Sequence, residues 1–131
     1  MTGVADTRLL LTLEFPPTEV LGGKVERFVE KEIARQLFVP SIVLTEFIKY
    51  AGPRIGEDAA LTRLRVLKEK GLRTVPLTEK DALTAGSILL ANSNVPIADA
   101  LIASFVKNGA AEYVITDDPH FTTLGVKTRW I

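Results

Sequence analysis

A chain of 131 residues is long enough for one folded domain, spanning 1–131, and leaves little room for a second. The 16 basic and 16 acidic residues balance overall and within each half of the chain, which excludes a strongly basic nucleic-acid-binding protein and an acidic tail. Apolar residues make up 47% of the chain, enough for a packed core and too many for a disordered protein.

The rare residue types narrow the chemistry further. The chain has no cysteine, which excludes disulfides, zinc ribbons and thiol catalysis and is compatible with a reducing compartment. Its one histidine, His120, excludes a histidine-rich metal site and disfavours a Ser-His-Asp triad. No signal peptide is apparent, and no stretch approaches the roughly 20 apolar residues that span a bilayer. We therefore expect a cytoplasmic protein without membrane contacts, whose chemistry rests on carboxylates, hydroxyls, lysine or arginine.

The first half of the chain predicts two short strands and four helices. The first helix should stop before Pro16, because proline cannot continue a helix. Ser41 is expected to cap the third helix, and Gly52-Pro53 to end it. In chain order, the predicted elements are strand 3–6, helix 7–13, helix 24–36, strand 37–39, helix 42–51 and helix 57–70.

The second half predicts strand 73–77, helix 79–91, helix 96–107, strand 112–116 and a last strand over 125–131. Thr78 and Asp81 have the spacing of a capping box, with Asp in place of the usual Glu. Because helices separate the strands, the connections are crossovers, and the chain predicts an α/β fold with a parallel sheet covered by helices on both faces. In such sheets, ligands bind at the carboxyl ends of the strands.

Several acidic residues stand where simple surface solvation does not explain them. Asp6 follows the first strand, and Asp117 and Asp118 follow strand 112–116. Glu46 and Asp99 each interrupt an otherwise apolar helix. Each has a structural alternative: Asp6 as the cap of helix 7–13, Glu46 as the partner of Lys49, Asp99 as a first-turn acid favoured by the helix dipole, and Asp117 or Thr116 as the cap of a final turn.

Four carboxylates at one end of a sheet would repel one another and raise one another's pKa values unless a cation is present. Hard oxygen donors, with one imidazole and no thiolate in the chain, favour Mg²⁺ or Mn²⁺. Such ions can activate water and stabilise the leaving oxygen in phosphodiester cleavage.

The order of these motifs resembles the PIN domain family. The resemblance covers nearly the whole chain and rests on five segments: D-T at 6–7, T-E at 45–46, P-I-A-D-A-L-I-A at 96–103, V-I-T-x-D-x-x-F at 114–121, and the closing G-V-K-T-R-W-I at 125–131. It implies a three-layer α/β/α sandwich with a central parallel sheet of about five strands. It also implies a Mg²⁺- or Mn²⁺-dependent ribonuclease, often the VapC-type toxin of a toxin–antitoxin pair, whose products carry a 5′-phosphate and a 3′-hydroxyl.

The resemblance also assigns roles to single residues. Asp6, Glu46, Asp99 and Asp118 match the four acids of the family: Asp6, Asp99 and Asp118 would bind the metal, and Glu46 would do so directly or through water. Thr7 and Thr116 match supporting hydroxyl residues, and Asp117 competes with Asp118 for the fourth position. Arg8 stands where the family commonly has Ser or Asn, and it could contact a phosphate or point outward.

Two alternatives remain open for the function. The chain could be a PIN-domain nuclease of ribosomal RNA or general RNA processing, or a non-catalytic PIN-like binding domain. As partners we expect an RNA substrate, a cognate VapB-like antitoxin that places a basic residue in the acidic pocket, and a second copy in a homodimer. If four of the 16 acidic residues are sequestered, the 16 basic residues outnumber the remaining 12 on the rest of the chain.

We expect the single histidine and the aromatic residues to have structural rather than catalytic roles. His120 is interpreted as a surface residue, and Phe105, Phe121 and Trp130 as core residues. Phe47 and Tyr50, which flank Glu46 on its predicted helix, are expected to make packing or dimer contacts. Candidate cations for the RNA backbone, or for a solvated face, are Lys49, Arg54, Arg63 and Arg65.

Overall fold

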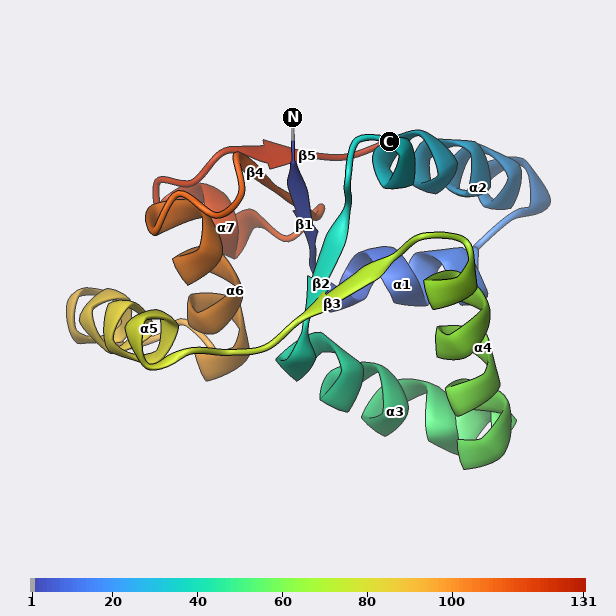
Figure 1. Cartoon of the computed structure of the whole chain (residues 1–131), viewed down its shortest axis with the longest axis horizontal. Helices are drawn as coiled ribbons and strands as arrows, with labels where there is room; N and C mark the ends of the chain where they lie inside the picture. Colours follow the sequence, from blue (N-terminus) through green and yellow to red (C-terminus); the bar gives the residue numbers. More distant parts are fainter. Residues whose placement is uncertain (1) are drawn as a thin grey trace.

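The structure, a computed structural model, describes residues 2–131 and contains five strands and seven helices within that range (Figure 1). The strands are β1 (Gly3–Ala5), β2 (Phe38–Pro40), β3 (Arg73–Val75), β4 (Tyr113–Ile115) and β5 (Thr128–Arg129). The helices are α1 (Thr7–Glu14), α2 (Glu19–Ala34), α3 (Ser41–Ile55), α4 (Glu57–Glu69), α5 (Glu79–Ala91), α6 (Ile97–Lys107) and α7 (Pro119–Thr123).

All neighbouring strands pair in parallel, in the order β3-β2-β1-β4-β5, so β1 lies at the centre of the sheet. Figure 1 shows α1 to α4 on one side of the strands and α5 to α7 on the other. This arrangement confirms the predicted three-layer α/β/α sandwich with a parallel sheet of five strands. Because β1 and β4 are neighbours, the segments that follow them leave the sheet side by side.

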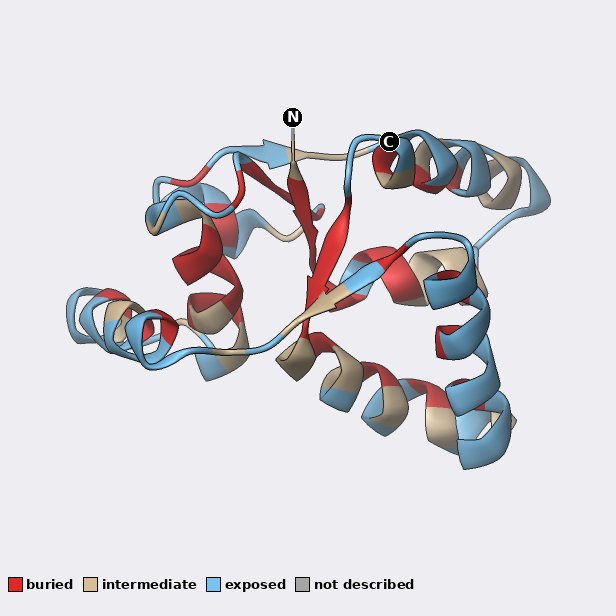
Figure 2. Cartoon of the chain, viewed as in Figure 1, coloured by how far each residue is buried: buried red, intermediate tan, exposed pale blue. Residues whose placement is uncertain are grey.

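The core lies along the three inner strands and the helix faces packed on them (Figure 2). Every residue of β1, β2 and β4 is buried, whereas the edge strands β3 and β5 are partly exposed. Phe38 of β2 and Phe105 of α6 meet edge to face, with ring centroids 5.5 Å apart. The sheet therefore anchors helices from both layers through its central strands.

The second helix begins earlier than predicted. It starts at Glu19 rather than at residue 24, because the Thr18 side chain accepts a backbone hydrogen bond from its first turn. Gly22 and Gly23, which precede the predicted start of the helix, lie inside it. A Cβ added at Gly22 would lie 3.0 Å from the Pro16 side chain, so glycine lets α2 pass close to the turn that precedes it.

Two expectations about the third helix are wrong. It continues through Gly52-Pro53 to Ile55, and the capping residue after it is Gly56, whose φ of 91° suits glycine. Pro53 lacks one backbone donor but lies in the last turn of an exposed helix end, where water can replace the lost bond. Ser41 does not cap the helix; it is the first helical residue, and Pro40 takes the cap position without a side-chain bond.

The other boundaries lie close to their predicted places. The capping box of Thr78 and Asp81 is confirmed, since each side chain accepts the backbone N–H of the other residue. The last strand pairs over two residues rather than over 125–131, and the expected final turn is the five-residue helix α7. Within the described part of the chain, no helix has the length and apolar character needed to cross a membrane.

A buried polar cluster joins α2 to the edge of the sheet. Glu32 is 2% exposed and accepts hydrogen bonds from Tyr113 Oη at 2.6 Å and from Arg129 Nη1 at 2.9 Å. The Arg129 guanidinium also lies over the Tyr113 ring, 4.6 Å from its centroid. A Cβ added at Gly3 would lie 2.6 Å from a Tyr113 ring atom, so glycine leaves room for this ring. The cluster ties the short strand β5 to the helix layer.

Replacing Tyr113 with Phe should therefore destabilise the fold. The change removes a donor from the buried Glu32 carboxylate, and we expect a loss of about 1–2 kcal/mol in the free energy of unfolding. Tyr50→Phe is the matched control, because the Tyr50 side chain is 48% exposed, and its expected change is below about 0.5 kcal/mol. Urea denaturation of both variants checks this, and equal midpoints would contradict it.

Candidate functional site

The acidic residues singled out from the sequence meet at the carboxyl edge of the sheet. Asp6 follows β1, and Asp118 follows the neighbouring strand β4. Asp99 comes from the first turn of α6, and Glu46 comes from α3. All four line one hollow of about 380 Å³, together with Thr7, Arg8, Leu11, Tyr50, Pro96 and His120.

Two threonine hydroxyls connect these acids. Thr116 Oγ1 donates to Asp6 Oδ2 at 2.7 Å and accepts the backbone N–H of Asp118 at 3.0 Å. Thr7 Oγ1 donates to Glu46 Oε1 at 2.6 Å, and the Thr7 N–H donates to Asp6 Oδ1 at 2.7 Å. Each threonine thus fixes one carboxylate relative to a second segment of the chain.

Two of the acids also have the structural roles that the sequence offered as alternatives. Asp6 caps α1 and Asp99 lies in the first turn of α6, yet both side chains also line the hollow. Glu46 is held by the threonine hydroxyl described above. Lys49, the partner of Glu46 in the structural alternative, instead has its Nζ 5.3 Å from the centroid of the Tyr50 ring.

The two neighbouring aspartates after β4 are separated by their contacts. Asp118 lines the hollow and caps α7, accepting the His120 N–H at 2.9 Å. The structural alternative in which Asp117 or Thr116 caps this turn is therefore wrong, because Asp118 caps it. Asp117 pairs with Arg8, whose Nε and Nη2 both donate to its carboxylate, the latter at 3.1 Å. These hydrogen bonds lower the pKa of the Asp117 carboxyl.

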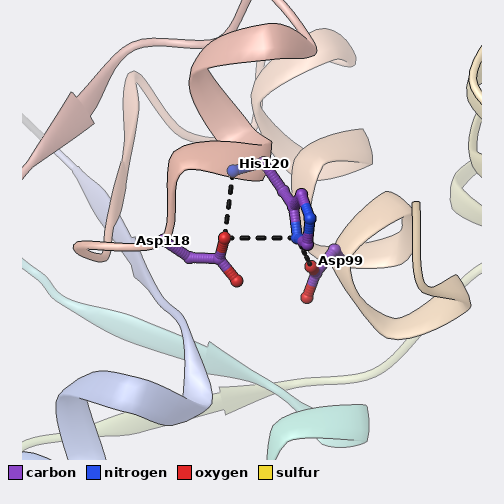
Figure 3. Close-up of side chains that lie close together, drawn as sticks. All are labelled: Asp99, Asp118 and His120. Atoms are coloured by element: carbon purple, nitrogen blue, oxygen red, sulfur yellow. Dashed lines mark hydrogen bonds and ion pairs between the residues drawn. The ribbon is translucent and has the colours of Figure 1, made fainter. Parts of the chain in front are cut away.

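His120 lies closer to the acids than the sequence suggested. Its side chain is half-exposed, but Figure 3 shows the ring turned toward two carboxylates. His120 Nδ1 lies 3.4 Å from Asp99 Oδ2 and 3.2 Å from Asp118 Oδ1. The signal in the sequence is the Asp-Pro pair before it, since a cap followed by proline starts a helix and places the next residue beside the cap.

Burial and crowding change the protonation of two of the acids. Burial raises the pKa of Asp6 to about 7, although the hydrogen bond from Thr116 favours the charged form. Burial also raises the pKa of Asp99 to about 6, and repulsion by Asp118 and Glu46 adds to the rise. Without a compensating positive charge, these two carboxyl groups retain protons well above the usual range for aspartate.

The donor set of the hollow fits a hard divalent cation. Asp99, Asp118 and His120 each offer one ligand atom, and these three atoms lie within 4.8 Å of one another. Asp6 and Glu46 add further carboxylates to the same hollow. Mostly oxygen donors suit Mg²⁺ and Mn²⁺, and the positive charge of a cation would also offset the burial and repulsion that raise the two pKa values.

The aromatic residues divide between the core and the hollow. Phe47, Phe105 and Phe121 are buried in the core, and Trp130 packs against it while partly exposed. Tyr50 is 48% exposed and lines the hollow, one turn along α3 from Glu46. The side of α3 that faces the acids therefore carries an accessible aromatic ring.

Replacing Asp99 with Asn should stabilise the metal-free protein above neutral pH. The folded-state pKa values of Asp6 and Asp99 lie above 3.8, so the native chain binds more protons than the unfolded chain between about pH 4 and 7. The free energy of unfolding therefore falls as pH rises through this window. In EDTA, Asp99→Asn should raise it by about 1–2 kcal/mol at pH 8 and change it little at pH 4.

Denaturant unfolding at both pH values measures this effect. The matched control is Asp58→Asn, because Asp58 also lies in the first turn of a helix but is exposed. The control should change the free energy of unfolding by less than about 0.5 kcal/mol at either pH. A loss of stability at pH 8 in Asp99→Asn would contradict the electrostatic account.

Solved structures of bacterial toxin–antitoxin proteins have the same fold at low sequence identity. VapBC2 from Rickettsia felis, bound to a DNA fragment from its promoter, matches with a TM-score of 0.75 and 16% identity, over 99% of this chain and 98% of that chain. DNA-bound VapBC from Salmonella typhimurium gives 0.74 and 20%, over 99% and 98%. VapC20 from Mycobacterium tuberculosis, a toxin that cleaves the sarcin-ricin loop, gives 0.74 and 16%, over 95% of each chain.

At these identities the likeness concerns the fold. Among curated proteins, none matches the chain in sequence. The PIN domain family model matches residues 4–127, which include every acid that lines the hollow. Since this match spans nearly the whole chain, the protein belongs to the PIN domain family.

Proposed function

We propose that the chain is a divalent-metal-dependent endoribonuclease and the toxin of a VapBC-type toxin–antitoxin pair. The observation that carries the proposal is the hollow at the carboxyl edge of the sheet, where four segments each contribute a carboxylate. Such crowding is costly for stability unless the acids bind a cation. The fold of VapC20, a toxin that cleaves the sarcin-ricin loop, supports RNA as the substrate class. The VapBC complexes among the similar structures favour a toxin over an RNA-processing enzyme.

In this proposal Asp6, Asp99 and Asp118 hold Mg²⁺ or Mn²⁺, and Glu46 contributes directly or through water. When bound, such a cation activates water for attack on phosphorus and stabilises the leaving oxygen. The chain's own hydroxyls orient the carboxylates. Thr116 holds Asp6 and the backbone after β4 in one arrangement, which keeps two of the acids in register.

Cleavage should depend on the cation and on Asp99. Purified protein in EDTA should leave a panel of tRNA and rRNA intact, and added Mg²⁺ or Mn²⁺ should start cleavage. Asp99→Asn should lower the rate at least about 100-fold, the size of effect seen when one preorganised charged or polar group is lost. Asp58→Asn serves as the control with a near wild-type rate. Cleavage that survives EDTA, or equal rates for wild type and Asp99→Asn, would refute the mechanism.

The fourth acidic position can be assigned by comparing two neighbouring substitutions. Asp118 lines the hollow, whereas Asp117 is bound to Arg8 at the side of it. Asp118→Asn should therefore lower the cleavage rate at least about tenfold more than Asp117→Asn. Rates measured on one RNA under single-turnover conditions decide the matter, and a larger loss at Asp117 would reverse the assignment.

We further propose that a VapB-like antitoxin restrains the chain by occupying a groove between α2 and α4. Two adjoining hollows of about 300 and 310 Å³ share Leu13, Glu26, Leu67 and Lys70. Their lining combines apolar side chains with charged side chains of both signs, which suits an amphipathic partner helix. A basic residue elsewhere on the same partner would pair with the acids of the catalytic hollow.

Val66→Glu should weaken this association, because Val66 lines the groove and is 41% exposed. Leu61→Glu is the matched control: Leu61 is 44% exposed on the same helix but lines neither hollow. Where a short reading frame lies beside this gene, its product is the probe, titrated calorimetrically. We expect at least about tenfold weaker binding for Val66→Glu alone, the effect of one buried unpaired charge. Equal affinities would exclude the groove.

We also propose a homodimer, but with its contact surface on other helices than the one expected from the sequence. The apolar residues of α3 are largely used in packing against the core, which leaves less free surface than the sequence suggested. Large exposed apolar side chains instead gather on α5 and at the start of α6: Leu83, Leu90 and Ile97. We place the contact between copies there rather than on α3.

A further inference from the structure

One partly exposed face of α1 leads away from the acidic hollow. Arg8, Leu11 and Thr12 follow one another at spacings of three and one residues, which places them on one side of the helix, and Phe15 is the residue directly after its last turn. Together with Pro17 and Arg54 they line another hollow, of about 180 Å³, which we call the second hollow; the first is the acidic hollow lined by Asp6, Glu46, Asp99 and Asp118. Arg8 and Leu11 line both hollows, so the two are continuous along α1.

A row of side chains on α3 follows the same course. Glu46, Tyr50 and Arg54 are spaced four residues apart and therefore lie in one row along the helix. Glu46 and Tyr50 line the acidic hollow, whereas Arg54 lines the second one. The helices α1 and α3 pack against each other, and both lie on the same side of the sheet (Figure 1). Along this row on α3 the charge changes from acidic at Glu46 to basic at Arg54.

The second hollow combines a flat cation with an aromatic ring. The Arg54 guanidinium lies over the Phe15 ring, with its central carbon 3.8 Å from the ring centroid. Within residues 2–131, Arg54 forms no ion pair with an acidic side chain. Arg8, between the two hollows, has part of its guanidinium bound to Asp117. Arg54 is thus held in place by stacking while its N–H groups remain available.

We infer that this second hollow is a nucleotide subsite for single-stranded RNA, in which Arg54 binds a backbone phosphate and offers its outer face to a base. The inference rests on the proposed function, because it places the strand that leaves the cleavage site. A guanidinium stacked on an aromatic ring can donate to phosphate oxygens from its edge and stack a base on its free face. Stacking accepts every base, so the subsite adds affinity without selecting a sequence.

The arrangement favours a nucleic acid over an acidic protein segment. A carboxylate would use only the edge of Arg54, whereas a nucleotide uses the edge and the flat face together. The subsite also continues directly from the acidic hollow through Arg8 and Leu11. A polynucleotide needs such continuity, because its scissile phosphate and its neighbouring nucleotide are covalently joined.

Binding of labelled RNA without cleavage tests the subsite. The probe is a fluorescein-labelled single-stranded RNA of mixed sequence, titrated with the full chain in EDTA and followed by fluorescence anisotropy at several salt concentrations. Arg54→Gln should raise Kd about tenfold and make the logarithmic salt slope shallower by about 0.7, the value of one phosphate contact to a single strand. Arg54→Lys keeps the charge but loses the flat face, so it should raise Kd about threefold with an unchanged slope.

The sequence left Arg65 as a candidate for the RNA backbone or for a solvated face, and the structure has it exposed on α4, where it lines neither of these two hollows. Arg65→Gln is therefore the matched control, because it removes the same charge from a solvated face. It should change Kd less than about twofold. Equal loss of affinity in Arg54→Gln and Arg65→Gln would overturn the subsite, even if RNA is cleaved with Mg²⁺. Failure of the wild type both to bind and to cleave RNA would overturn the proposed function itself. Unchanged RNA affinity in Arg54→Gln, with weaker binding of the antitoxin, would identify the hollow as a protein contact and also overturn the inference.

Discussion

Repulsion among the carboxylates around one hollow is the constraint on which the site depends. Buried negative charges destabilise a fold unless hydrogen bonds or cations compensate them. The chain supplies part of this compensation with two threonines, whose hydroxyls bind Asp6 and Glu46. Burial raises the pKa values of Asp6 and Asp99, and repulsion from neighbouring carboxylates adds to the rise. Keeping these carboxylates ionised in the hollow therefore lowers the free energy of unfolding, and a bound cation would offset this loss of stability.

The order of the strands makes this crowding possible. The central strand β1 pairs with β4, so Asp6 and Asp118 leave the sheet together although they are far apart in the chain. Sequence patterns were sufficient to predict a parallel sheet with both acids at its carboxyl edge, because strands that alternate with helices require parallel crossovers and parallel strands end at one edge. They did not predict that β1 and β4 are neighbours. The caps were sufficient for α5, whose capping box of Thr78 and Asp81 marks its start.

Other features depend on contacts that sequence spacing does not contain. Proline usually ends a helix, but Pro53 lies where α3 is exposed and already near its end, so the helix continues past it. The place of His120 depends on how α7 turns after its cap, which brings the ring to two acids from different segments. The sequence motifs singled out the acidic residues of the hollow. Which other side chains contact these acids depends on tertiary packing, which the motifs do not contain. The pairing of Arg8 with Asp117 likewise joins residues that no local pattern relates.

The cap of α7 has a consequence for the dynamics of the site. Asp118 Oδ1 accepts the backbone N–H of His120 and also lies next to the histidine ring. Any ligand that binds this oxygen competes with the hydrogen bond from the His120 N–H, which caps the five-residue helix α7. Occupation of the hollow and local opening of this helix are therefore thermodynamically linked. The rate of hydrogen exchange at the backbone amide of His120 would therefore report whether a ligand occupies the hollow.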